Sequence, residues 1–212
     1  MIEFKDVCLR YGNKEIIKNL SLKIERGAKV VVAGESGVGK SSILHLILGF
    51  AIASDGEVVF DGVPVDDKSV WDVRKKVAYV DQDISVGEAK GYEWIDFVCA
   101  LKANDSLNIT KQKIDDVCCL FNLNSDLLNK DMTALSGGER QRLAIVVSIL
   151  LNRKIFLLDE ITSALDKNLK KKVANYFLNK PDWTVLTVSH DPVWQDNPSV
   201  KIFDLEAGTW RQ

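Results

Sequence analysis

The eight residues GESGVGKS, at positions 34–41, have the types and spacing of a loop that binds phosphate. Its glycines permit backbone conformations closed to other residues, so consecutive N–H groups can point at phosphate oxygens. A short apolar run precedes the loop, and a predicted helix follows it and adds partial positive charge. We expect Lys40 to reach the outer phosphates of a nucleotide and the Ser41 hydroxyl to ligate Mg²⁺.

Two carboxylates, Asp159 and Glu160, directly follow the apolar run at residues 155–158. In an open α/β sheet, ligands bind outside the carboxyl ends of the strands. Asp159 is therefore a candidate to hold Mg²⁺, directly or through water. Glu160, one residue further on, is a candidate to polarise an attacking water molecule.

The octapeptide LSGGERQR, at residues 135–142, combines a helix cap with an exposed helix end. Ser136 is a favourable N-cap residue, and Glu139 three positions later completes a capping box. Gly137 and Gly138 leave the positive end of the helix without side chains. A phosphate can therefore approach that end closely, which indicates a second anion site on a different helix.

Hydrophobic periodicity predicts an α/β fold with additional strands near the N-terminus. Alternating residues in the first 25 positions indicate two half-buried strands joined by a YGN turn, and an Asp61-Gly62 turn indicates a small hairpin. Helical spacing from about residue 88 to 129 indicates a helical insert. Buried strands are expected at residues 29–33, 77–80, 155–158 and 184–188, helices at 40–48, 136–151 and 168–178, and a final hairpin at 200–208.

Charge and hydropathy restrict the class of partner. The 28 basic and 30 acidic residues give a net charge of −2, so no global basic field favours a nucleic acid partner. No apolar run approaches the roughly 18 residues needed to cross a bilayer, and the N-terminus lacks the pattern of a signal peptide. We therefore expect a cytoplasmic chain, whose membrane-spanning partner, if it has one, is a separate polypeptide.

The phosphate loop, the acidic pair and LSGGERQR together give the chain a clear resemblance to the ABC (ATP-binding cassette) ATPases. The resemblance covers essentially the whole length, with the elements in the family's order. It implies a P-loop NTPase fold: a mixed sheet flanked by helices, with an N-terminal antiparallel β subdomain and a helical insert at about residues 83–135. We expect a single ABC ATPase domain over residues 1–212.

The resemblance also implies that ATP and Mg²⁺ are bound between two copies arranged head to tail. Each ATP would be clamped by the phosphate loop of one copy and by Ser136, Gly137 and Gly138 of the other. Tyr11 occupies the position of the family's aromatic residue that stacks on adenine. The expected ATP-binding residues within one chain are Tyr11, Gly34, Glu35, Ser36, Gly37, Val38, Gly39, Lys40, Ser41 and Ser42.

Two further positions match catalytic residues of the family. Gln82 fits the Q-loop glutamine, which contacts Mg²⁺ or the water, although Asp81 stands where the family often has proline. His190, after the strand at residues 184–188, matches the histidine that contacts the γ-phosphate. The expected catalytic residues are thus Glu160, His190 and Gln82, and the expected metal ligands are Ser41, Gln82 and Asp159.

The segment at residues 163–166 matches the D-loop, which crosses the dimer interface in this family. It consists of Ser163, Ala164, Leu165 and Asp166.

Two hypotheses about the wider function follow from the resemblance. In the first, the chain is the ATPase subunit of a transporter, peripheral on the inner face of the cell membrane. It would pair with a second ABC ATPase subunit as a homodimer, and exposed aromatics of its insert, such as Tyr92 and Trp94, would dock on a permease. In the second, it is a soluble single-cassette ATPase that acts as an assembly scaffold. A third interpretation, a small-molecule kinase, explains residues 34–41 but not residues 135–142.

Overall fold

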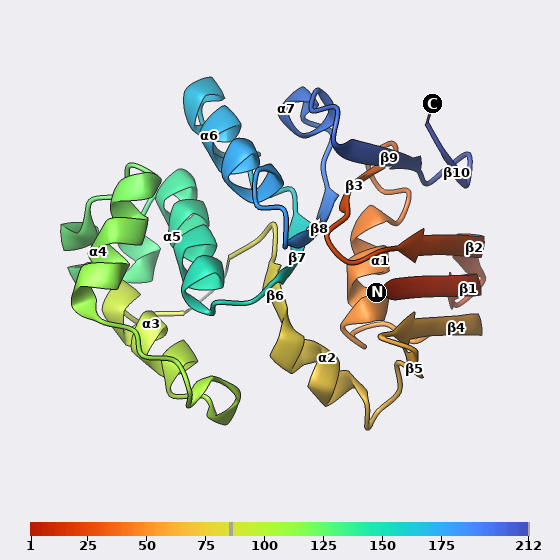
Figure 1. Ribbon diagram of the computed structural model, residues 1–212, viewed down its shortest axis with the longest axis horizontal. Helices are drawn as coiled ribbons and strands as arrows, with labels where there is room; N and C mark the ends of the chain where they lie inside the picture. Colours follow the sequence, from red (N-terminus) through yellow and green to blue (C-terminus); the bar gives the residue numbers. More distant parts are fainter. Residues whose placement is uncertain (85–86, 212) are drawn as a thin grey trace.

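The computed structural model describes residues 1–84 and 87–211, which form two sheets with helices around them (Figure 1). The antiparallel sheet has the strand order β2-β1-β4-β5, and the mixed sheet has the order β10-β9-β3-β8-β7-β6. The first sheet consists of β1 (Ile2–Tyr11), β2 (Lys14–Ile24), β4 (Asp55–Phe60) and β5 (Val63–Pro64). The second consists of β3 (Lys29–Ala33), β6 (Val77–Val80), β7 (Ile155–Asp159), β8 (Thr184–Val188), β9 (Val200–Asp204) and β10 (Thr209–Trp210).

Seven α-helices occur in the described part of the chain, and three short 3₁₀ helices lie within or beside the insert. The helices are α1 (Lys40–Ile47), α2 (Val70–Lys76), α3 (Gly91–Cys99), α4 (Lys111–Leu120), α5 (Gly137–Leu150), α6 (Lys167–Leu178) and α7 (Pro192–Gln195). The 3₁₀ helices are η1 (Lys102–Asn104), η2 (Ser125–Asn129) and η3 (Met132–Ala134). None of the helices in these ranges has both the length and the apolarity that a membrane span requires.

Two hydrophobic cores lie on opposite faces of the mixed sheet. On one face, α1 packs between this sheet and the antiparallel sheet, and its Ile43, Leu44 and Ile47 are fully buried. On the other face, α5 and α6 cover the sheet, and the insert helices α3 and α4 lie further out (Figure 1). All residues of β3 and β8 are buried, as expected for strands covered by helices on both faces.

The four central strands end at the same edge of the sheet. The pairs Val32–Val188, Val188–Asp159 and Leu158–Val80 align the ends of β3, β8, β7 and β6 to within about one residue, and all of these pairings are parallel. The loops that leave these strands therefore emerge side by side. This edge is where the sequence placed the phosphate loop, the acidic pair, Gln82 and His190.

The predicted fold class is confirmed, since the sheet is mixed, the N-terminal strands are antiparallel and the insert is helical. Two of these helices were not predicted from the sequence. Helix α2 has seven residues, of which only Val70 and Val73 are buried, and α7 has four residues beginning at Pro192. Helices this short leave too few buried positions for periodicity to reveal them.

Asp61 anchors the start of the chain to the β4–β5 turn. With φ values of 52° at Asp61 and 86° at Gly62, the turn has the left-handed geometry predicted for this dipeptide. The Asp61 carboxylate accepts hydrogen bonds from the N-terminal ammonium at 2.8 Å, Arg26 at 2.9 Å and Lys76 at 3.3 Å. Burial opposes ionisation of this carboxyl, but the three cations outweigh that effect and lower the pKa of Asp61 to about 2.

We predict that Asp61→Asn lowers the free energy of unfolding at pH 7 by about 1 kcal/mol, less than the full pKa shift implies because solvent screens these partly exposed charges. Asparagine tolerates the left-handed conformation, so the change removes charge and leaves the turn geometry available. Because the folded pKa is depressed, the stabilisation is complete above the unfolded pKa of about 4 and is lost as the pH falls towards 2.

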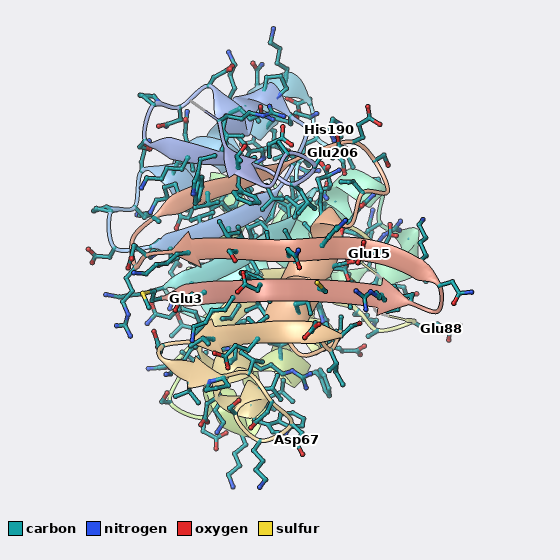
Figure 2. All side chains as sticks on the ribbon, turned by 90° about the vertical axis from the view of Figure 1, so that its right-hand side faces the viewer. Glu3, Glu15, Asp67, Glu88, His190 and Glu206 are labelled. Carbon is teal, nitrogen blue, oxygen red and sulfur yellow. The ribbon has the colours of Figure 1, made fainter. Side chains whose placement is uncertain are left out.

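Urea unfolding of both proteins between pH 2 and pH 7 checks this prediction. Asp67→Asn is the control, because Asp67 is exposed on the loop before α2 and projects from the molecule (Figure 2). A deficit in Asp61→Asn that stays constant down to pH 2 would contradict the assigned role of the charge.

Candidate functional site

The phosphate loop connects β3 to α1, and its glycines are needed for two different reasons. Gly37 has a φ of 82°, and a Cβ placed there would meet no atom within 4 Å, so its conformation alone requires glycine. Gly39 has a φ of 105°, and a Cβ there would lie 2.6 Å from Cγ2 of Ile16 on β2. The antiparallel sheet therefore presses directly against the loop and helps to determine its shape.

Lys40 begins α1 and directs its ammonium group into the loop. Its Nζ donates hydrogen bonds to the carbonyl oxygens of Gly34 at 3.0 Å and Glu35 at 2.7 Å, and the side chain is buried. These carbonyls are neutral acceptors, whereas a phosphate oxygen would offer a stronger, charge-assisted bond at the same place. The ammonium is thus held where a triphosphate would meet it.

A cavity of about 560 Å³ lies at the carboxyl edge of the sheet, within the size range of small-molecule sites. It brings together most of the residues that the sequence placed at the nucleotide, from five separate segments of the chain. Ile16, Val188 and Ser163 were not predicted to line it, and only their tertiary position reveals them. The lining residues are Tyr11, Ile16, Gly34, Ser36, Gly37, Gly39, Lys40, Ser41, Ser42, Gln82, Glu160, Ser163, Val188 and His190.

Tyr11 stands at the end of β1, where its side chain is 55% exposed and free to stack on a flat base. Figure 2 places Glu15, just after the β1–β2 turn, on the same side of the molecule as His190, and Glu3 at the opposite end. The turn that carries Tyr11 therefore reaches the edge where the strands of the mixed sheet end.

Two predicted ATP-binding residues, Glu35 and Val38, do not line this cavity. The backbone N–H of Glu35 donates to Oε1 of Glu206 at 2.9 Å, from the turn after β9. The Val38 side chain lines a neighbouring cavity of about 540 Å³ together with Leu205 and Glu206. Their expected contact with ATP would therefore be made through the loop backbone, on the side away from the β9–β10 turn.

Asp159 is a buried carboxylate with one oxygen that lacks a partner. Burial raises its pKa; a hydrogen bond with Ser41 opposes the rise, and the nearby Asp81 and Glu160 carboxylates add to it. Its Oδ1 has no hydrogen-bond partner among the described residues. Because Mg²⁺ prefers oxygen ligands and uses one or two carboxylates alongside phosphates, an unpartnered Asp159 oxygen beside the Ser41 hydroxyl fits this ion.

Glu160 and His190 form a direct contact across two strand ends. Oε1 of Glu160 lies 2.9 Å from Nδ1 of His190, with the glutamate side chain largely buried and the histidine side chain exposed. Glu160 has a φ of 45°, a left-handed backbone that costs about 1–3 kcal/mol for a residue other than glycine. Such strain persists only where surrounding contacts hold it in place.

Residues 135–138, which we name the signature loop, lead into α5, and their cap is the one that the sequence predicted. Ser136 Oγ accepts from the Glu139 N–H at 3.3 Å, and Glu139 Oε2 accepts from the Ser136 N–H at 2.7 Å. Hydrogen bonds that the Ser136 backbone N–H and hydroxyl donate to the carboxylate lower the pKa of Glu139. Ser136 and Gly137 are exposed, and a Cβ at Gly137 would have no atom within 4 Å. None of Ser136, Gly137 and Gly138 lines the cavity described above.

The segment at residues 163–166 divides between surface and core. Ser163 and Ala164 are exposed. Leu165, also expected at the dimer interface, packs its side chain into the core and is 8% exposed. Asp166 caps α6 by accepting from the N–H groups of Asn168 and Leu169, each at 3.0 Å. Only the first two residues therefore present free side chains.

Comparison with known proteins agrees with this geometry. Residues 17–163 match the family model described as ABC transporter. The chain is 31% identical over 198 residues to the energy-coupling factor transporter ATP-binding protein EcfA1 of Oceanobacillus iheyensis, covering 90% of this chain and 70% of that protein. It is 31% identical over 203 residues to the ATP-dependent lipid A-core flippase of Haemophilus influenzae, of which it spans only 33%, while 89% of this chain is covered.

The fold also matches solved structures of ATP-binding cassettes. A dimeric ATP-binding cassette in a post-hydrolysis state, bound to ADP and Pi, superimposes with a TM-score of 0.85 and 26% identity, covering 100% of this chain and 97% of that one. A bacterial Atm1-family exporter with ATP bound also has a TM-score of 0.85 over 100% of this chain and 38% of that one. At 23% identity the exporter supports the fold alone.

A phosphate loop, a buried acidic pair and a histidine at one edge of a mixed sheet define an ATPase of the P-loop class. Because the family model covers more than half of its residues, this chain belongs to the ABC transporter family, and it is an ATP-binding ATPase of that family.

We predict that Lys40→Ala weakens ATP binding by about 100-fold, because it removes a cation that would form charge-assisted bonds to the phosphates. Titration with a fluorescent ATP analogue measures the effect. Lys171→Ala, at an exposed lysine of α6, is the matched control and should leave binding unchanged. Equal affinity in both variants would remove Lys40 from the site.

Proposed function

We propose that this chain is the ATP-hydrolysing subunit of an ABC transporter and that two copies pair head to tail on ATP to drive a membrane permease. We further propose that residues 1–212 act as one ATPase domain. The observation that carries the pairing is that Ser136, Gly137 and Gly138, at a helix end suited to an anion, do not line the nucleotide cavity of their own chain. A second copy can complete each cavity with its own helix end.

The residues of one chain would hold ATP at the edge of the mixed sheet. Tyr11 stacks on the base, the loop N–H groups surround the phosphates, and Lys40 neutralises the outer ones. Ser41 and Asp159, with Gln82 at the cavity wall, would hold Mg²⁺, which would supply positive charge beside the phosphates. The unpartnered Asp159 oxygen is the feature that favours a cation there.

Glu160 and His190 would act on the γ-phosphate. Phosphoryl transfer has a loose transition state, so orientation of the water and neutralisation of charge contribute most of the rate. Glu160 lines the cavity and is held 2.9 Å from His190, so it can orient a water molecule while the histidine contacts the phosphate. Cleavage removes negative charge from between the two copies, and the pair then opens.

Exposed apolar side chains support a protein partner, on a different surface from the one predicted. Tyr92 and Trp94 are half-buried against the core, which corrects the expectation that they are the exposed aromatics of the insert. Five of the exposed apolar side chains lie in or near α2 and α3: Phe50, Ile52 and Trp71 at α2, and Phe97 and Leu101 around the end of α3. We name these five residues the docking surface.

One side chain joins the two halves of the docking surface. Arg153 donates to the carbonyl oxygens of Arg74 in α2 and of Val77, and at 2.7 Å to Oδ1 of Asn104 beside α3. Nearer the surface, the half-buried Arg74 guanidinium lies 4.9 Å from the ring centres of both Phe50 and Trp71. An arginine between two exposed aromatic rings suits a partner helix that is apolar with an acidic residue.

We therefore propose that the chain works in the cytoplasm, peripheral on the inner face of the cell membrane, with a permease on the docking surface. The relatives' names support the class, since they include an energy-coupling factor ATP-binding protein, a lipid A-core flippase and, in Photobacterium profundum, the Fe(3+) ions import ATP-binding protein FbpC.

We predict that Glu160→Gln abolishes most hydrolysis and traps an ATP-bound dimer, because the water is no longer oriented while the phosphate contacts remain. Size-exclusion chromatography with ATP and Mg²⁺ detects the dimer. Adding Ser136→Arg to this variant should prevent dimerisation but leave nucleotide binding by the monomer intact, because Ser136 lies outside the chain's own cavity.

Ser106→Arg in the same background is the control, since it places the same charge on an exposed serine outside the signature loop. A Ser136→Arg monomer that fails to bind nucleotide would argue that the signature loop serves its own chain. A Glu160→Gln protein that stays monomeric with ATP and hydrolyses it normally would remove Glu160 from the proposed role.

We predict that the double substitution Phe50→Ser and Trp71→Ser leaves the ATPase rate of the purified protein unchanged, because neither residue contacts the nucleotide cavity. The same variant should lose its association with membranes when it is expressed with its permease. Trp210→Ser, at an exposed aromatic of β10, is the matched control and should still co-fractionate. Wild-type protein that never co-fractionates would favour the soluble scaffold.

A further inference from the structure

Gln141 is a buried polar side chain on α5, in the turn that follows the signature loop. It is 3% exposed, and both ends of its amide are bonded to loops of the nucleotide site. Its Nε2 donates to the carbonyl oxygen of Glu160 at 3.2 Å, and its Oε1 accepts from the N–H of Ala164 at 3.1 Å. A buried amide is costly unless such partners exist, so the two loops and this residue depend on one another.

The hydrogen bond from Gln141 is accepted by a residue with a strained backbone. Glu160 has a left-handed φ of 45°, and hydrogen bonds hold the peptide groups on both sides of it. Its N–H donates to the Val188 carbonyl at 2.9 Å, and its carbonyl accepts from the Ser163 N–H at 3.0 Å as well as from Gln141. Of these three bonds, only the one from Gln141 comes from the helix that carries the signature loop.

The hydrogen bond between Gln141 and Ala164 lies beside a second contact between α5 and residues 163–164. A Cβ at Gly138 would lie 2.9 Å from the carbonyl oxygen of Ala164, so the signature loop and residues 163–164 touch directly. Beside them is a small cavity of about 270 Å³, lined by Gln82, Gly137, Gln141 and Ser163 among others. Three loops of the site thus converge around the Gln141 amide.

We propose that Gln141 is a positioning residue that makes the aim of Glu160 depend on the placement of the signature loop of the same chain. This rests on the proposed function, in which the signature loop holds the partner's ATP and Glu160 acts on the chain's own ATP. Capture of the partner's nucleotide positions the first turns of α5. The amide transmits that position to the Glu160 carbonyl and the Ala164 N–H, so that one site becomes competent when the other is filled.

The test is Gln141→Met, which keeps the length of an unbranched side chain and removes both hydrogen bonds. We expect kcat for ATP hydrolysis to fall by about 10- to 100-fold, the scale of a misplaced reacting group, with KM and the affinity for a fluorescent ATP analogue little changed. Hydrogen exchange at the Ala164 amide should become faster. Ser148→Ala, which removes another buried polar group from α5, is the control and should leave kcat unchanged.

Two further variants make the result decisive. Gln141→Glu keeps an acceptor for Ala164 but places a buried carboxylate against the Glu160 carbonyl in place of the donor, so we expect a loss of kcat at least as large, and it serves as the test if Gln141→Met does not fold. In the Glu160→Gln background, Gln141→Met should reduce residual hydrolysis no further, because both changes act through the same side chain. The ATP-trapped dimer should still form in that double variant.

A wild-type kcat in Gln141→Met, or in Gln141→Glu where only that variant folds, overturns the proposal. An equal loss of kcat and nucleotide affinity also overturns it, because a disturbed core would produce that result. Failure of the proposed function is read separately, from Glu160→Gln with Gln141 intact: if that protein forms no ATP-dependent dimer, the head-to-tail pairing itself is wrong.

Discussion

Strands β3, β8, β7 and β6 pair side by side in parallel, and the loop leaving each one carries one part of the nucleotide site. Burial on both faces removes these strands from water and leaves little freedom for one to slide past another. Thr187 adds a cross-strand bond from its Oγ1 to the Leu158 carbonyl. The alignment of the strand ends therefore determines whether phosphate loop, carboxylates and histidine meet.

The charged side chains at the nucleotide cavity do not neutralise one another. Asp159, Glu160 and Asp81 gather near one another, and the pKa of the buried Asp159 is raised as a result of its burial and these neighbours. Lys40 is the cation of the phosphate loop, and its partners there are two backbone carbonyls. Clustered carboxylates and an ammonium held by neutral groups support the proposal that a metal ion and a polyanion bind here together, because each would supply the charge that the protein groups lack.

The charged residues of LSGGERQR act mainly on backbone groups. Arg140 donates to the Leu135 carbonyl at 2.6 Å, and Arg142 donates to the Gly138 carbonyl at 3.2 Å and to Asn122 at the end of α4. Glu139 completes the cap. These bonds fix the shape of a loop whose glycines would otherwise be mobile, and they attach it to the insert. These hydrogen bonds consequently hold the exposed N-terminal end of α5 in a fixed position.

The sequence by itself determined features that depend on neighbouring residues. The glycine conformations of the phosphate loop, the Ser136–Glu139 capping box, the Asp61-Gly62 turn and the buried strands all follow from local sterics or short-range hydrogen bonds, and the structure confirms them. The family resemblance added Tyr11, Gln82 and His190, which line one cavity as expected.

Only the tertiary structure decided which side chains are exposed and which distant groups they bond. Leu165 is buried and Trp94 is half-buried because both pack against the core that α5, α6 and the insert share, and no local pattern predicts this packing. Gln141 forms hydrogen bonds with residues 19 and 23 positions away in the sequence. The Glu35 N–H bonds Glu206, which is 171 positions away. Such contacts arise from the packing of whole elements, so the physical information that specifies them is spread over the entire chain rather than held in a motif.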